Sequence, residues 1–156
     1  MKIILFDGTF KTTSFINRLA KGLSCDHDIY IMGFNEDLEF RIPDITYVPL
    51  GSNQSYWRLF IVSLTYAFQT KKLLNILKVF KNVLCRKKKN LQNQNLFIVL
   101  SKIQPEIVHL QWLSNISLFE EYLENNTYKF VLSQISGGCS IDFTSHETLK
   151  TLTNHY

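Results

Sequence analysis

The sequence is poor in cysteine, and its three cysteines restrict the kinds of protein it can be. Cys25, Cys85 and Cys139 do not have the spacing of a metal site. An odd number of cysteines also argues against a disulfide framework. We therefore expect reduced thiols and a cytoplasmic location, and the sequence indicates no metal ligands.

Long apolar runs are absent as well. The first apolar run ends at Phe6 and is broken at once by Asp7 and Gly8, so it is too short for a signal peptide. The longest mostly apolar run, Leu59 to Phe68, is about half of the roughly 20 residues that cross a bilayer. The sequence therefore predicts no membrane-spanning segment.

Glycine is scarce, with six residues in the whole chain. The turn after the first apolar run has one glycine and does not contain the G-x-G-x-x-G pattern. That pattern brings the backbone close to the pyrophosphate of a dinucleotide, so its absence argues against a nucleotide-cofactor oxidoreductase.

Acidic residues are missing from a long central stretch, because none occurs between Asp44 and Glu106. Residues 71–89 carry eight of the 17 lysines and arginines, which leaves nine to set against 13 acidic residues. The net charge of +4 therefore comes from one segment. Its basic residues are Lys71, Lys72, Lys78, Lys81, Arg86, Lys87, Lys88 and Lys89.

The basic segment has two interpretations that the sequence leaves open. Exposed lysines usually form a solvated helix face. A basic helix beside apolar residues is also typical of contact with an anionic membrane surface on the inner face of the membrane, where each charge contributes about 1 kcal/mol. The aromatic residues are not interleaved with arginine and no recognition motif is present, so we expect no nucleic-acid partner.

The remaining pattern predicts a single α/β domain. Short apolar runs alternate with segments of helical periodicity, which is typical of a Rossmann-like open parallel sheet with helices on both faces. The predicted strands are residues 2–6, 28–32, 45–50, 107–110 and 130–132. The predicted helices are residues 12–23, 56–85, 96–103, 117–123 and 145–153, with a polar break at 90–95.

Within the long helical region, apolar residues recur at spacings of three and four. This spacing puts them on one side of a helix. We expect that side to pack against the sheet, with the lysines outside. The residues are Leu73, Ile76, Leu77, Phe80, Val83 and Leu84.

The stretch from Pro105 to Trp112 predicts where a ligand binds. Proline cannot continue a helix, and the four mostly apolar residues that follow Glu106, Ile107 to Leu110, are typical of a buried strand. In a parallel sheet, ligands bind beyond the carboxyl ends of the strands. Three loops should meet there, and their candidate substrate-binding residues are Asp7, Gly8, Thr9, His109, Gln111, Trp112, Ser136, Gly137 and Gly138.

Each of these candidates also has a purely structural interpretation. His109 is either a substrate contact or a satisfied core residue, and Trp112 either stacks on a sugar ring or caps the core. Asp7 could bond its own backbone in a turn. Gly137 and Gly138 could simply form a turn. The sequence does not identify a catalytic residue.

Several segments resemble the amino-terminal domain of a GT-B glycosyltransferase of the large retaining family commonly called family 4. The matching pieces are residues 1–5, 17–23 and 27–31. Stronger similarity lies in Lys102-Ile-Gln-Pro-Glu-Ile-Val-His-Leu-Gln-Trp112, followed by Lys129-Phe-Val-Leu-Ser133 and the glycine pair. The resemblance covers nearly the whole chain and implies one half of a GT-B fold.

The resemblance implies transfer of a sugar from a nucleotide-sugar donor to a sugar or lipid-linked acceptor, in bacterial surface polysaccharide or glycolipid synthesis. In that family a separate carboxyl-terminal domain holds the donor, and the chain resembles only the acceptor side. We therefore expect an apparently truncated enzyme, with no cofactor bound by this chain and no activity in isolation. The alternative is a non-catalytic module that binds a membrane surface or a glycan.

Overall fold

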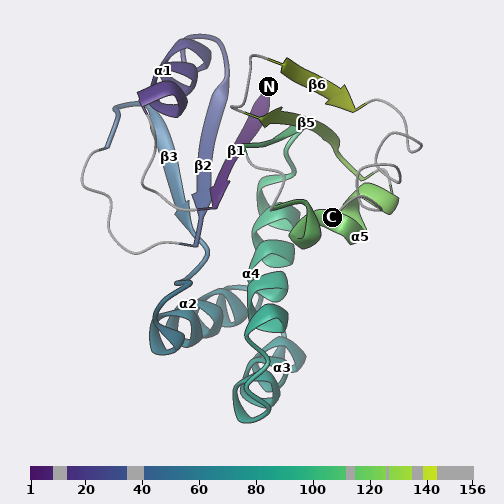
Figure 1. Ribbon diagram of the computed structural model, residues 1–156. Coiled ribbons are helices and arrows are strands. Elements are labelled where there is room, and N and C mark those ends of the chain that lie inside the picture. Colours follow the sequence, from purple (N-terminus) through teal and green to yellow (C-terminus); the bar gives the residue numbers. More distant parts are fainter. Residues whose placement is uncertain (9–13, 35–40, 112–114, 126, 135–138, 144–156) are drawn as a thin grey trace.

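The computed structural model describes residues 1–8, 14–34, 41–111, 115–125, 127–134 and 139–143 (Figure 1). In the described chain the parallel strands are separated mostly by helices, as the sequence predicts. The elements are β1 (Lys2–Gly8), α1 (Ser14–Leu23), β2 (Asp28–Gly33), β3 (Ile45–Pro49), α2 (Tyr56–Gln69), α3 (Leu73–Leu84), α4 (Lys88–Ile103), β4 (Ile107–Leu110), α5 (Ile116–Glu124), β5 (Lys129–Gln134) and β6 (Cys139–Phe143). The predicted helix at 145–153 lies outside the described residues.

The strands form one sheet in the order β3-β2-β1-β4-β5-β6. The first five strands in that order are parallel, and β6 pairs antiparallel with β5. The protein therefore has the α/β, Rossmann-like fold that the sequence predicts. The antiparallel edge strand was not predicted, because Cys139–Phe143 is short and follows a glycine pair that indicates only a turn.

The alternation of side chains along each strand divides the core into two layers. Ile3 and Leu5 point to one face of β1, where Ala20 of α1 packs among them. Ile4 and Phe6 point to the other face, which packs against α4 and α5. Helices thus cover both faces of the sheet (Figure 1), which confirms the sequence prediction.

An aromatic group holds α5 on the second face. The Phe119 ring lies 4.9 Å from the ring of Phe6 and 5.9 Å from the ring of Phe130, in edge-to-face geometry. Such pairs add about 0.5–1.5 kcal/mol to the free energy gained by burying the rings. This packing holds α5 against β1 and β5.

A second helical unit extends beyond the carboxyl ends of the strands. It consists of α2, α3 and the amino-terminal half of α4, and we call it the helical projection (Figure 1). Its core contains Leu59, Ala67, Val79 and Leu91, which are all fully buried. Helix α3 packs on α2 and α4. The projection therefore has a small core of its own beside the carboxyl edge of the sheet.

The predicted helix at 56–85 is wrong in one respect, because the structure has two helices there. Helix α2 ends at Gln69, and Lys71 has a φ of 54°, which lies in the left-handed region. The side chain of Thr70 stabilises the turn, since its Oγ1 accepts hydrogen bonds from Asn75 Nδ2 at 3.0 Å and from the Lys72 amide at 3.4 Å. The reversal lets α3 fold back on α2.

The predicted polar break at residues 90–95 is also wrong, because α4 begins at Lys88. Two of its amide side chains, Gln92 and Asn95, are buried and hydrogen-bonded to the link between β3 and α2. Gln92 Nε2 donates to Asn53 Oδ1 at 2.6 Å, and Asn95 Nδ2 donates to the Leu50 carbonyl at 2.8 Å. Burial of a polar side chain is tolerated when it has such a partner.

The apolar residues that recur along α3 do not pack against the sheet, contrary to the sequence prediction. Leu73, Leu77, Phe80 and Leu84 are 69%, 55%, 46% and 84% exposed. Contacts of α3 with the other helices are made by Val79, Ile76 and Val83 on the adjoining side of the helix. Much of the apolar side of α3 therefore stays exposed to solvent.

Candidate functional site

Four polar side chains gather at the carboxyl edge of the sheet, and we call them the edge cluster. They are Asp7 on β1, His109 on β4, Gln111 directly after β4, and Ser133 on β5. The strand register explains the grouping, because His109 is level with Leu5 and Val131. Residues two positions further along each strand point to the same face.

Hydrogen bonds join three members of the edge cluster in a row. His109 Nε2 lies 2.6 Å from Ser133 Oγ, and Gln111 Nε2 lies 3.5 Å from His109 Nδ1. Asp7, His109 and Gln111 are at most 9% exposed, whereas Ser133 is half-buried. Ser133 is therefore the member of the row that a ligand reaches most easily.

The Gln111 amide has a buried oxygen, Oε1, with no hydrogen-bond partner in the described part of the chain. The two ends of an amide are assigned from hydrogen bonding, so the group can be turned by a half-turn. Oε1 then accepts a hydrogen bond from His109 Nδ1–H, and the Ser133 hydroxyl donates a hydrogen bond to His109 Nε2. In that orientation the row holds the Ser133 oxygen ready to accept a further hydrogen bond.

The structure brings together some of the predicted site residues. Asp7, His109 and Gln111 lie in the edge cluster, and Gly8 ends β1 opposite Gly33 of β2. Ser133 was not among the substrate-binding residues predicted from the sequence. The signal was its position two residues after Val131, which becomes informative only when the register with His109 is known. The predicted residues Thr9, Trp112, Ser136, Gly137 and Gly138 lie outside the described residues.

A polar groove of about 570 Å³ lies between α3, α4 and α5, and we call it the amide groove. Asn75, Asn93 and Gln94 supply amides, and Phe97 adds an aromatic ring that is 59% exposed. Gln94 Nε2 donates to the Asn75 carbonyl at 2.9 Å. The amide groove was not predicted from the sequence, because residues 90–95 of α4 were expected to form a polar break between helices.

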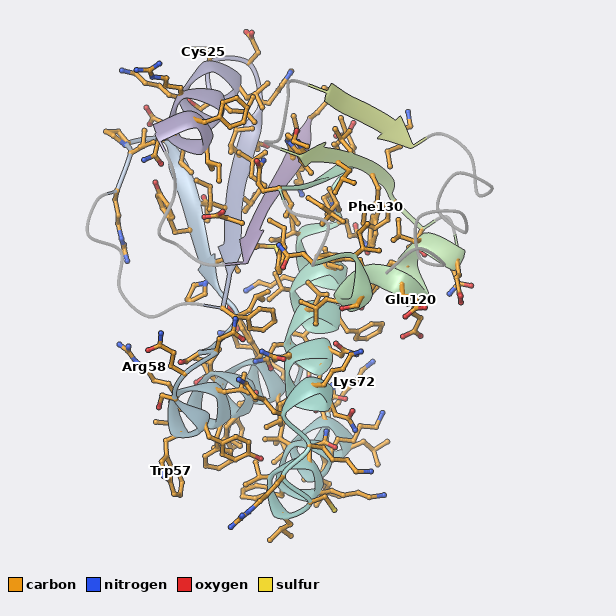
Figure 2. All side chains as sticks on the ribbon, viewed as in Figure 1. Cys25, Trp57, Arg58, Lys72, Glu120 and Phe130 are labelled. Carbon is orange, nitrogen blue, oxygen red and sulfur yellow. The ribbon has the colours of Figure 1, made fainter. Side chains whose placement is uncertain are left out.

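The amide groove has walls of opposite charge. Lys78 and Lys89 lie on the side of α3 and α4, and Glu120, Glu121 and Glu124 lie on α5. Figure 2 shows Glu120 pointing outward from α5. Amides, carboxylates and ammonium groups together offer both donors and acceptors, which is the chemistry that sugar hydroxyl groups require.

The eight basic residues lie where the sequence predicts a basic segment. They occupy α3, its two connecting turns and the first turn of α4, and all are exposed except Lys88, which is half-buried. The Lys88 ammonium donates to the Asn53 carbonyl. In the parts of the chain that the structure describes, no helix is long and apolar enough to cross a membrane.

No protein-family model, curated protein or solved structure matches the chain. Among the described residues, no group of three or more histidine, cysteine or acidic side chains could hold a metal ion. The features of the protein that bear on its function are the geometry of the edge cluster and of the amide groove, together with the family resemblance of the sequence.

Proposed function

We propose that the chain is the acceptor-side domain of a retaining glycosyltransferase of the GT-B, family 4-like type. The main support is that β1 and β4 place Asp7, His109 and Gln111 on one face at one edge of the sheet, beside Ser133. His109, Gln111 and Ser133 come from segments that resemble the family, and Asp7 lies two residues after another such segment. Asp7 and His109 are more than 100 residues apart in the sequence. The sheet brings them together because β1 and β4 are parallel neighbours in its strand order.

The chemistry of the edge cluster suits an acceptor sugar. A carboxylate at Asp7 accepts hydrogen bonds from sugar hydroxyl groups, and the Ser133 hydroxyl both donates and accepts. His109 and Gln111 lie beneath and hold Ser133 through hydrogen bonds. The acceptor is a sugar or a lipid-linked sugar, as in bacterial surface polysaccharide or glycolipid synthesis. In the family that the sequence resembles, a second domain holds the nucleotide-sugar donor, so we expect these 156 residues in isolation to lack transferase activity.

A binding experiment with two serine variants tests this proposal. We expect the chain to bind bacterial surface glycans on an array, and Ser133→Ala to weaken binding about two- to tenfold, the range of one hydrogen bond. Ser101→Ala is the matched control because Ser101 is exposed on α4, in the half that adjoins the sheet. Equal binding by the native chain and Ser133→Ala would contradict the proposal, as would rapid sugar transfer by the chain alone.

A second candidate function is a non-catalytic glycan-binding module that uses the amide groove. The groove combines amides and carboxylates with the exposed ring of Phe97, and aromatic rings stack on the apolar faces of sugars. The same array separates the two functions. Loss of binding in Phe97→Ser, with Ser133→Ala unaffected, would assign the glycan to the amide groove and not to the edge cluster.

A further inference from the structure

Helix α2 carries an apolar strip on its outward side. Trp57, Ile61 and Phe68 are 73%, 59% and 59% exposed, and the half-buried Leu64 lies between them. The spacing of four, three and four residues puts all four on one side of the helix. The inward side is occupied by Leu59 and other small or apolar residues. The strip therefore does not contribute to the packing of the helical projection.

Helix α3 has a strip with the same spacing. Its members are Leu73, Leu77, Phe80 and Leu84, each between 46% and 84% exposed. Isolated exposed apolar residues are common, but contiguous apolar patches on a soluble domain indicate a site of interaction. Two outward strips on adjacent helices form such a patch.

Aromatic contacts join the two strips. The Phe60 ring lies 6.1 Å from the ring of Trp57 and 6.0 Å from the ring of Phe80, with edge-to-face geometry in both pairs. Beside them is a depression of about 510 Å³ whose floor is apolar and whose rim carries Arg86 and Lys88. Figure 2 shows the Trp57 side chain pointing away from the body of the protein.

The charge around the patch selects its partner. No acidic residue occurs between Asp44 and Glu106, so the whole helical projection is positively charged. A second copy of the chain would bring the same positive charge to a symmetric interface, which is unfavourable. An anionic bilayer supplies both apolar contact and negative charge.

We propose that the outward face of α2 and α3 docks in the plane of an anionic bilayer. Trp57, Leu77, Phe80 and Leu84 enter the boundary between headgroups and acyl chains, and the exposed Arg86 and Lys87 contact lipid phosphates. The helices lie on the membrane and do not cross it. This inference requires no sugar chemistry and stands apart from the proposed function.

Vesicle flotation tests the docking. The full chain should float with vesicles that contain phosphatidylglycerol and remain behind with phosphatidylcholine alone. Raising the salt concentration to about 1 M should weaken binding, because the Debye length falls to about 3 Å. Each change of Arg86 or Lys87 to Gln should weaken binding about fivefold.

A matched pair of variants tests the apolar contact. Phe80→Ser should weaken binding to the anionic vesicles at least tenfold, whereas Phe15→Ser should leave it unchanged. Phe15 is 47% exposed, close to the 46% of Phe80, but it lies on α1, which packs on the sheet. Trp57 emission should shift to shorter wavelength with anionic vesicles, and Trp57→Phe should remove the shift. Far-ultraviolet circular dichroism confirms that the variants fold.

Three results would overturn the proposal. Equal flotation with neutral and anionic vesicles would show that charge does not select the partner. Equal losses of vesicle binding in Phe80→Ser and Phe15→Ser would show that the apolar patch does not contact the bilayer. A stable dimer of the native chain in sedimentation equilibrium, broken by Phe80→Ser, would show that the strips form an interface between subunits.

Discussion

Gln111 is fully buried at the centre of the edge cluster, and its Oε1 has no partner among the described residues in the assigned amide orientation. A buried polar atom without a hydrogen bond costs about 1–3 kcal/mol. Residues that lower stability in this way are found at functional sites, where chemistry is selected at the expense of packing. Gln111 has this property. Asn95 Oδ1 also lacks a partner among the described residues, but Asn95 Nδ2 donates to the Leu50 backbone carbonyl at 2.8 Å, whereas Gln111 Nε2 lies 3.5 Å from His109 Nδ1.

We therefore expect Gln111→Leu to leave the free energy of unfolding within about 1 kcal/mol of the native value, or to raise it. Leucine has a similar volume and removes the buried acceptor. Asn95→Ala should lower the free energy of unfolding by about 1–3 kcal/mol, because it removes a buried hydrogen bond. Urea denaturation measures both. A larger loss in Gln111→Leu than in Asn95→Ala would be inconsistent with a site selected for function.

Tyr66 joins α2 to the end of β3 by donating its hydroxyl proton to the Pro49 carbonyl at 2.7 Å. Burial raises the pKa of Tyr66 from 10.0 to about 12. Below pH 10, where the tyrosine is neutral in the unfolded chain too, Tyr66 makes its full contribution to the free energy of unfolding. It is lost as the pH rises from 10 towards 12, because only the unfolded form ionises in that window.

The measurement is the free energy of unfolding of the native chain and Tyr66→Phe between pH 8 and pH 12. We expect Tyr66→Phe to be less stable at pH 8, by about 0.5–1.5 kcal/mol for one hydrogen bond. The difference between the two proteins should shrink above pH 10. Burial also raises the pKa values of Tyr122 and Tyr128, so both proteins should lose some stability in alkali. A constant difference would contradict the role of Tyr66.

At the scale of elements, the link between β3 and α2 decides where the helical projection begins. Gly51 has a φ of 114°, which side chains other than glycine rarely adopt. A Cβ atom at this position would lie 2.6 Å from Leu59 Cδ1 and 3.1 Å from Leu59 Cα. The chain can therefore turn into α2 at this place only with glycine.

Two glycine substitutions test this link. Gly51→Ala should lower the free energy of unfolding by about 2 kcal/mol or more, from backbone strain and from the contact with Leu59. Gly22→Ala is the control, since a Cβ atom there has nothing within 4 Å. In α1 the change should raise stability by about 0.5–1 kcal/mol. Thermal or urea unfolding measures both variants. Equal changes in the two variants, or a larger loss of stability in Gly22→Ala than in Gly51→Ala, would contradict the structure.

At the scale of the whole molecule, the helical projection and the edge cluster share one side. The strands of the parallel sheet point towards the projection, so the edge cluster lies at the end from which α2 and α3 extend (Figure 1). If α2 and α3 rest on a bilayer, the carboxyl edge of the sheet is brought near the lipid surface. This arrangement would suit an acceptor that is anchored in lipid.

Limited proteolysis measures this orientation. With anionic vesicles we expect trypsin to cut more slowly after Lys81, which borders the outward strip of α3, because the bilayer covers that face. Cleavage after Lys21 should be unchanged, since this exposed residue lies at the end of α1, on the sheet. Equal protection of Lys21 and Lys81 would contradict the proposed orientation. Neutral vesicles serve as the control.

Much of the fold was predictable from local patterns. Short apolar runs bounded by turn residues identified all five parallel strands, and apolar spacing identified α1. The candidate site was predictable in part, because the carboxyl ends of parallel strands share an edge and this placed Asp7, His109 and Gln111 together. Ser133 required the register between β4 and β5, which no local pattern contains.

The amino-acid sequence by itself determined which sides of the helices are apolar and where the positive charge lies. Only the tertiary structure decided what those sides contact. Helix α3 illustrates the difference, because its apolar spacing predicts one buried side, yet Val79 packs inward while Leu77 and Leu84 face outward. Periodicity is a property of one helix, whereas burial depends on which neighbours reach it, and the turn at Thr70 places α3 against α2 and α4 and away from the sheet.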